Sequence, residues 1–97
     1  MTFEELIQSN ELVLVDFYAD WCQPCQMMKP ILVDVKTKVG DSAKIVKIDV
    51  DKYQDLSAQF QVRSIPTLIL FKKGEPIWRQ AGVVQAPDLV NLIQQAK

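Results

Sequence analysis

The chain contains two cysteines, and both lie in the stretch DFYADWCQPCQMMKP at residues 16–30. Cys22 and Cys25, at positions i and i+3, share one face of a helical turn, which places their Cβ atoms roughly 5–6 Å apart. A small local adjustment brings that separation within disulfide range. The pair can therefore change between dithiol and disulfide without unfolding its surroundings.

The position of the pair favours nucleophilic chemistry. The cysteines follow an apolar run at 12–18 and open a helical pattern. Free backbone N–H groups at the start of a helix stabilise a thiolate, which is the nucleophile in thiol chemistry. We therefore expect Cys22, at the exposed end, to be the attacking thiolate and Cys25, one turn further on, to be more buried.

Two other uses of the cysteines are weaker. The sequence has no histidine and one CxxC pair, which supplies half of the ligands that zinc prefers, so a zinc site would need a dimer that shares its cysteines. A structural disulfide that closes so short a ring would stabilise the fold little. A cysteine pair in a reducing compartment is more often catalytic or metal-binding than structural, and redox chemistry is the favoured interpretation.

Length and composition indicate a single domain over residues 1–97, with 48% hydrophobic residues and a net charge of −1. The chain has no basic stripe that would neutralise nucleic-acid phosphates, and no apolar run approaches the ~18 residues of a membrane span. The N-terminal MTFEELIQSN is acidic and polar, unlike a secretory signal. We expect a cytoplasmic protein, with a removed signal peptide as the alternative.

The hydrophobic pattern predicts the element order αβαβαββα. Strands that alternate with helices indicate a mixed α/β sheet with helices on both faces. The segment LVLVDFY is apolar on both alternating faces apart from Asp16, which indicates a strand that is buried on both sides. The expected helices are Thr2 to about Ser9, Cys22 or Pro24 to Val39, 54–60 and one starting at Pro87; the expected strands are 12–18, 44–50, 67–73 and 76–82.

Four segments, VDFYADWCQPC, KIDVD, VRSIPTLILFKKGE and QAGV, resemble the thioredoxin family in order and separation. The resemblance runs from about residue 12 to the C-terminus. It implies the thioredoxin fold and a protein disulfide reductant, in which Cys22 attacks a substrate disulfide and Cys25 resolves the mixed disulfide. The family usually has a strand before the first helix, and the few residues before Leu12 leave no room for one. We therefore expect a four-stranded sheet, in which the N-terminal strand is either trimmed or naturally absent. The strand 44–50 would then be an exposed edge. We expect a monomer, with pairing of this edge to another chain as a possibility.

Asp16 is the one charged residue in its strand. Burial of a carboxylate raises its pKa, and such a residue is either a proton acceptor or a structural aspartate bonded to nearby backbone. The resemblance implies the former, with Asp16 helping to deprotonate Cys25. It also matches Lys47 to a family lysine that approaches this aspartate, although the pattern alone would make Lys47 a solvated strand residue.

The resemblance also implies a substrate-binding surface around the cysteines. It places a cis proline at Pro66, where the pattern alone would indicate an ordinary trans proline, and an exposed lid at Trp21, which could otherwise be core. Gln23 stands where the family usually has glycine. Gln26 stands where a cation is frequent in the family, and the absence of that charge should leave the Cys22 thiolate slightly less stabilised. The expected binding residues are Trp21, Gln23, Pro24, Ile65, Pro66, Gly82 and Val83.

The resemblance implies no bound cofactor, and recycling by a thioredoxin reductase that uses NADPH. Its substrates would be disulfide-containing proteins, including those that reduce ribonucleotides, peroxides and methionine sulfoxide. Two alternatives stay open: a disulfide oxidant or isomerase in an oxidising compartment, and a redox-gated binding module whose apolar surface surrounds Trp21 and Pro66.

Overall fold

The elements of the computed structural model, which describes residues 2–97, begin and end within one residue of the predicted bounds. Two of the helix ends have a clear local cause. Thr2 and Glu5 form a capping box at the start of the first helix, with hydrogen bonds of 3.0 and 3.1 Å, and Gly40 ends the longest helix at φ +56°. The helices are α1 (Phe3–Ser9), α2 (Gln23–Val39), α3 (Gln54–Gln59) and α4 (Ala86–Ala96), with a 3-10 turn at Gly40–Ser42; the strands are β1 (Leu12–Tyr18), β2 (Lys44–Asp49), β3 (Thr67–Lys72) and β4 (Glu75–Ala81).

The strands form one mixed sheet in the order β2-β1-β3-β4. Strand β1 is parallel to β2 and antiparallel to β3, and β3 forms an antiparallel hairpin with β4. The predicted four-stranded sheet is confirmed, and β2 is an edge strand as expected. The described residues before β1 form α1 rather than a strand.

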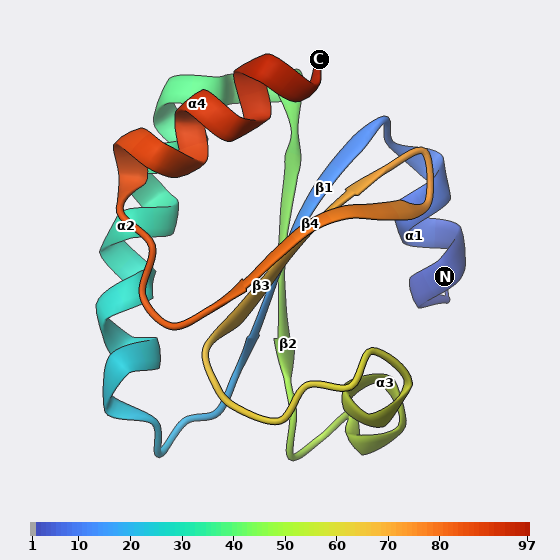
Figure 1. Ribbon diagram of the computed structural model, residues 1–97, viewed down its shortest axis with the longest axis vertical. Coiled ribbons are helices and arrows are strands. Elements are labelled where there is room, and N and C mark those ends of the chain that lie inside the picture. The colour runs from blue at the N-terminus through green and yellow to red at the C-terminus, as the bar shows by residue number, and fades with distance from the viewer. Residues whose placement is uncertain (1) are drawn as a thin grey trace.

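Helices cover both faces of the sheet (Figure 1), with α2 and α4 on one side and α1 and α3 on the other. Because side chains alternate along a strand, β1 contributes to two separate cores. Leu12 and Leu14 pack toward α2 and α4, whereas Val13, Val15 and Phe17 pack on the face of α1 and α3. Asp16, in step with Leu12 and Leu14, therefore faces α2.

The core on the face of α1 and α3 contains four aromatic rings. Phe3 and Phe60 each lie edge-on to Phe71, with ring centroids 5.8 and 5.4 Å apart, and Phe17 lies 6.2 Å from Phe60. We call Phe3, Phe17, Phe60 and Phe71 the aromatic cluster. Burial of such rings contributes strongly to folding. None of the helices in residues 2–97 has the length and hydropathy to cross a membrane.

Candidate active site

The cysteine pair lies at the start of α2, just after the loop that connects it to β1. Cys22 is the N-cap of α2 and Cys25 is in its first turn. The two form a disulfide, with Cα atoms 5.2 Å apart, so the predicted pairing on one helical turn is confirmed. Within residues 2–97, no three acidic, cysteine or histidine side chains are grouped as a metal site would require.

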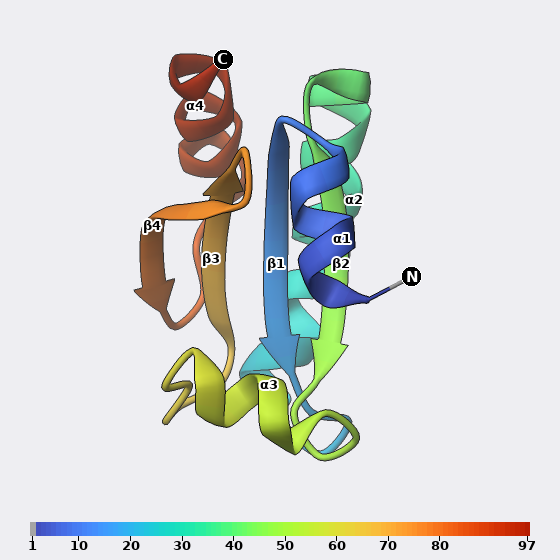
Figure 2. The same ribbon diagram turned by 90° about the vertical axis from the view of Figure 1, so that its right-hand side faces the viewer.

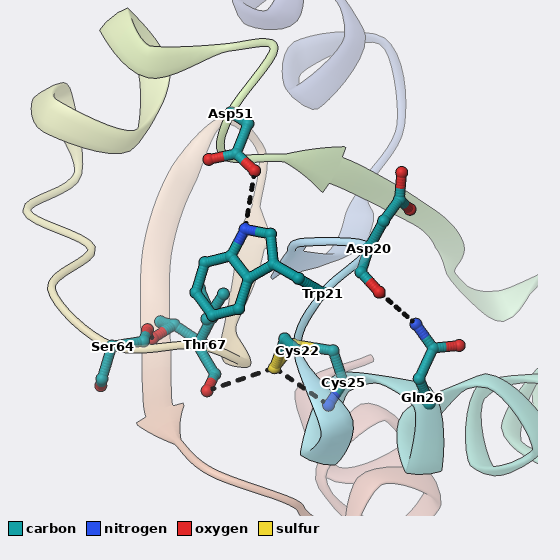
Figure 3. Close-up of a disulfide and its surroundings, with 9 residues drawn as sticks. Asp20, Trp21, Cys22, Cys25, Gln26, Asp51, Ser64 and Thr67 are labelled. Carbon is teal, nitrogen blue, oxygen red and sulfur yellow. Dashed lines mark hydrogen bonds between the residues drawn. A yellow bond between two sulfur atoms is a disulfide. The ribbon is translucent and has the colours of Figure 1, made fainter.

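The start of α2 directs a hydrogen-bond donor at Cys22. The backbone N–H of Cys25 donates to Cys22 Sγ at 3.2 Å, as capping side chains accept from the first turn of a helix (Figure 3). After reduction the same donor and the positive end of the helix favour the thiolate form of Cys22. The local geometry thus supports Cys22 as the attacking sulfur.

The expected contrast in exposure between the cysteines is small in the disulfide form. Cys22 is 4% exposed and Cys25 2%. The low exposure of Cys22 has a cause in a distant loop: Ile65 packs against the cluster of Ala19, Cys22 and Cys25, and its carbonyl oxygen is 3.8 Å from Cys22 Sγ. A disulfide sulfur has no proton to donate to this carbonyl, whereas the Cys22 thiol has one.

Trp21 is a surface residue, with 72% of its area exposed, so the alternative that placed it in the core is wrong. Its indole Nε1 donates a hydrogen bond to Asp51 Oδ2 at 2.9 Å, which holds the ring beside the disulfide (Figure 3). The role of Asp51 was not predicted from the sequence. The available signal was that Asp51 follows β2, a parallel neighbour of β1, because the carboxyl ends of parallel strands meet at one edge of the sheet.

Gln26 has a contact that its residue type did not reveal. Its side-chain Nε2 donates to the carbonyl oxygen of Asp20 at 3.1 Å, so the first turns of α2 hold the loop that carries Trp21. Gln23 and Pro24 are exposed at the start of α2. Two side chains therefore hold the loop before Cys22: Asp51, in the turn after β2, bonds Trp21, and Gln26, in α2, bonds Asp20.

The other predicted binding residues come from two loops at the same end of the sheet. The Ile65–Pro66 peptide bond is cis, as the resemblance implied, and Pro66 is buried. The N–H of Gly82 donates to the Pro66 carbonyl at 2.8 Å, which joins the loops. Gly82 has φ +94°, a conformation that favours glycine, and Val83 packs against the core beneath α4.

Asp16 is 1% exposed, and neither carboxylate oxygen has a hydrogen-bond partner. The backbone-bonded alternative is therefore not what the structure contains. Burial raises the pKa of Asp16 to about 6, although the positive charge of Lys47 acts in the opposite direction. Asp16 faces α2, whose first turn carries Cys25.

Lys47 lies beside Asp16 in the register of β1 and β2. It is exposed, and its Nζ sits 4.7 Å from the centre of the Tyr18 ring, a distance typical of a cation–π contact. Lys47 thus has the solvated position that the pattern alone predicted and also the proximity to Asp16 that the resemblance implied.

Comparison with known proteins gives one consistent result. The thioredoxin family profile matches residues 1–95. A thioredoxin-like protein of Synechocystis sp. is 50% identical over 91 residues, which cover 94% of this chain and 87% of that protein. The chloroplastic thioredoxin Y of Oryza sativa subsp. japonica is 46% identical over 98% of this chain, but the match spans 57% of the rice protein.

A solved structure agrees with these relatives. A mutant thioredoxin of Halobacterium salinarum superposes with a TM-score of 0.88 at 39% identity, over 96% of this chain and 80% of that one. Sequence, fold and the disulfide at the start of α2 lead to the same assignment. The chain belongs to the thioredoxin family and has the redox-active cysteine pair of a protein-disulfide oxidoreductase.

Proposed function

We propose that the protein is a protein disulfide reductant that passes two electrons from its Cys22–Cys25 dithiol to other proteins. The observation that carries the proposal is the placement of this pair at the N-terminus of α2, on the sheet face that buries the unpartnered carboxyl of Asp16. A thiolate-stabilising helix end and a buried proton acceptor are the two parts that such an exchange needs.

In the first step the Cys22 thiolate attacks one sulfur of a substrate disulfide. A mixed disulfide forms, and the other substrate sulfur leaves as a thiolate. In the second step Cys25 gives its proton to the Asp16 carboxylate and attacks Cys22 Sγ. The second substrate sulfur leaves as a thiolate, and the Cys22–Cys25 disulfide remains.

Asp16 is suited to this proton transfer because its pKa is raised to about 6. A base with a pKa near the working pH is ionised often enough to accept a proton and strong enough to hold it during the reaction. The positive charge of Lys47 stabilises the ionised form of Asp16 and so limits the increase in pKa that burial causes. We place Asp16 and Lys47 in the catalytic machinery on this basis.

The substrate chain would dock on the surface around the disulfide. Trp21 offers an exposed indole, and Ile65 lies against Cys22, so an apolar segment that flanks a disulfide could cover both. An extended substrate can pair with backbone beside Pro66. Gln23, Pro24, Gly82 and Val83 complete the proposed contact surface.

Recycling of the oxidised protein requires a second partner that reduces the Cys22–Cys25 disulfide. By family membership we assign it to a thioredoxin reductase that draws electrons from NADPH, and the substrates to proteins with reducible disulfides, such as those that reduce ribonucleotides, peroxides and methionine sulfoxide. A cytoplasmic location stays a prediction from the sequence. The rice relative is chloroplastic by name, which is another location to test.

The equilibrium reduction potential of the pair in graded thiol buffers, followed by tryptophan fluorescence, tests the direction of electron flow. We expect a value near the roughly −270 mV of a reducing thioredoxin. A shift of about 60 mV or more toward oxidising values, two powers of ten in the equilibrium constant, would instead identify an oxidant or isomerase.

A Cys25→Ser variant separates chemistry from binding. If the protein is a reductant, this variant accumulates mixed disulfides between Cys22 and its substrates, because the resolving thiol is absent. If partners bind to the variant equally well without forming that bond, the protein is a redox-gated binding module. The reductant proposal would then be wrong.

A further inference from the structure

The outer edge of β2 is open. In the order β2-β1-β3-β4, this strand pairs with β1 alone, and Figure 2 shows it at one side of the sheet with α2 behind it. Over the described part of the chain, no backbone hydrogen bond links residues 44–48 to any segment other than β1. Such an edge presents a row of free N–H and C=O groups to another extended chain.

A groove of about 440 Å³ runs between this edge and α2. We call it the β2–α2 groove. Its apolar part is open to solvent rather than sealed, because Val33 is 67% exposed and Ile45 is only partly buried. The residues that carry the argument are Leu32, Val33 and Ile45 in the apolar part and Lys29, Lys36 and Lys47 around it.

The charge of the groove is unbalanced. No acidic side chain is among its lining residues. Lys36 donates to the Gly40 and Ala43 carbonyls, which are neutral acceptors and leave its charge in place. The carboxylate next to Val33, that of Asp34, is paired with Lys38 at 3.2 Å. The groove therefore combines apolar contact area with positive charge from Lys29 and Lys36 that no acidic side chain in its lining neutralises, while Lys47 also lies beside Asp16.

We propose that the β2 edge and the β2–α2 groove together form a docking site for an extended acidic segment of a partner protein. The segment adds to the sheet as a further strand beside β2, and its backbone pairs with the free groups of that edge. Because its side chains alternate between the two faces of the sheet, every second residue points toward α2: an apolar residue enters the groove over Ile45, and acidic residues two positions away on the same face reach Lys29 and Lys47.

A second copy of the chain fits this site less well. Antiparallel pairing of two β2 edges would continue the sheet and place both α2 helices on the same face. Lys29, Lys36 and Lys47 of each copy would then meet at one junction, and like charges brought together oppose association. An acidic partner segment has the opposite effect. The cysteine pair is not part of this site, so the proposal does not depend on the direction of electron flow.

The test uses two end-blocked octapeptides, added to the oxidised protein, in which every second residue is threonine. The positions between, which share one face of an extended chain, alternate valine with glutamate in one peptide and valine with lysine in the other. We expect the glutamate peptide to shift the amide resonances of β2 and to slow hydrogen exchange at its outward amides. The lysine peptide, with the same valines and length, should leave β2 unchanged. Binding should weaken as salt is added, because the charges are at the surface.

Variants locate the site. Lys29→Glu should weaken the glutamate peptide about fivefold, as expected for loss of a surface ion pair and gain of a repulsion, and Val33→Glu, which adds a carboxylate to the groove at an exposed position, should do the same. Lys97→Glu makes the same charge change at the chain end and should leave affinity within about twofold. Lys47 is left intact because it neighbours Asp16.

Three results would overturn the proposal. The glutamate peptide could leave β2 unchanged in a folded protein, or both peptides could bind equally, which would indicate unspecific strand pairing. Alternatively, the β2 resonances could shift with protein concentration in the absence of peptide, together with an increase in molecular mass. That result would identify a second copy of the chain as the occupant.

Discussion

The two faces of strand β1 are built on opposite principles. Phe17 points into the aromatic cluster on the face of α1 and α3, within a core of apolar side chains. Asp16, the residue before it, points toward α2 and carries a carboxyl that no group in the described chain satisfies. Both residues are essentially inaccessible to solvent, at 0% and 1% exposed. Neighbouring positions of one strand thus combine a strongly stabilising side chain with a destabilising one.

The difference shows where stability and chemistry are separated in this fold. A buried carboxyl without hydrogen bonds costs free energy, and such a cost at a site facing the redox helix is typical of functional positions. The aromatic cluster on the other face has no such group and can offset the cost. The comparison predicts that substitutions on the two faces affect different measurements.

The largest effect is expected at the cysteines. Cys22→Ser removes the attacking thiolate, so reduction of a protein disulfide should fall to background, while the fold changes little because so short a disulfide ring contributes little. Stopped activity with a retained unfolding transition would support the separation of roles. If Cys22→Ser kept activity that was lost when Cys25 was also replaced, Cys25 rather than Cys22 would be the attacking sulfur.

Removal of a ring from the aromatic cluster should affect stability rather than chemistry. Phe71→Ala deletes a side chain that is 0% exposed, and such changes reduce the free energy of unfolding by about 3–5 kcal/mol. Urea unfolding measures this loss, and the rate of disulfide reduction per folded molecule should stay near the native value. A variant that is fully folded but inactive would break the comparison between the two faces.

The Asp16 carboxyl should make stability fall as pH rises. Its pKa is about 6 in the folded protein against 3.8 for the free group. Below pH 3.8 it is protonated in both states. Between these values the unfolded chain ionises first, so unfolding is favoured by about 3 kcal/mol at the upper end, and the loss persists above pH 6.

Asp16→Asn should remove this dependence, because an amide does not titrate. Urea unfolding of the oxidised native and variant proteins at several pH values between 4 and 7.5 measures the difference. Asp41→Asn, at an exposed position, is the matched control and should retain the native slope. Parallel pH profiles for native protein and Asp16→Asn would show that folding does not raise the pKa of Asp16.

The smallest effect is expected where the cysteine loop is held. Gln26→Met keeps the size of the side chain but loses the donor to the Asp20 carbonyl. Loss of one solvent-accessible hydrogen bond should lower the free energy of unfolding by about 1 kcal/mol or less. Gln26→Lys keeps a donor and adds a charge, so it should leave the Cys22 thiolate more stable than either other form. Urea unfolding measures the loss in Gln26→Met. Titration of Cys22 by its reactivity with an alkylating reagent compares the native protein with Gln26→Lys, and identical titration curves would contradict the charge effect.

Periodicity was sufficient for the order of helices and strands, because the α2 and β1 patterns each match a single element type and Gly40 marks the end of α2; the thioredoxin fold and its four-stranded sheet followed from the family resemblance. The cysteine chemistry also followed from local spacing. The hydrogen bond from Trp21 to Asp51 and the burial of Cys22 by Ile65 could not be predicted, because both join loops that are distant in sequence. The contact from Gln26 to Asp20 depends on how the loop turns before the helix, which spacing does not specify.

The most direct test is the rate at which the mixed disulfide is resolved, measured across pH in the native protein and in Asp16→Asn. Rapid mixing of reduced protein with a disulfide substrate, quenched with acid, gives that rate. If Asp16 accepts the Cys25 proton, the native rate rises with an inflection near pH 6, close to its pKa, and the variant is slower and lacks the inflection. Superimposable profiles would show that the buried carboxyl takes no part in the reaction.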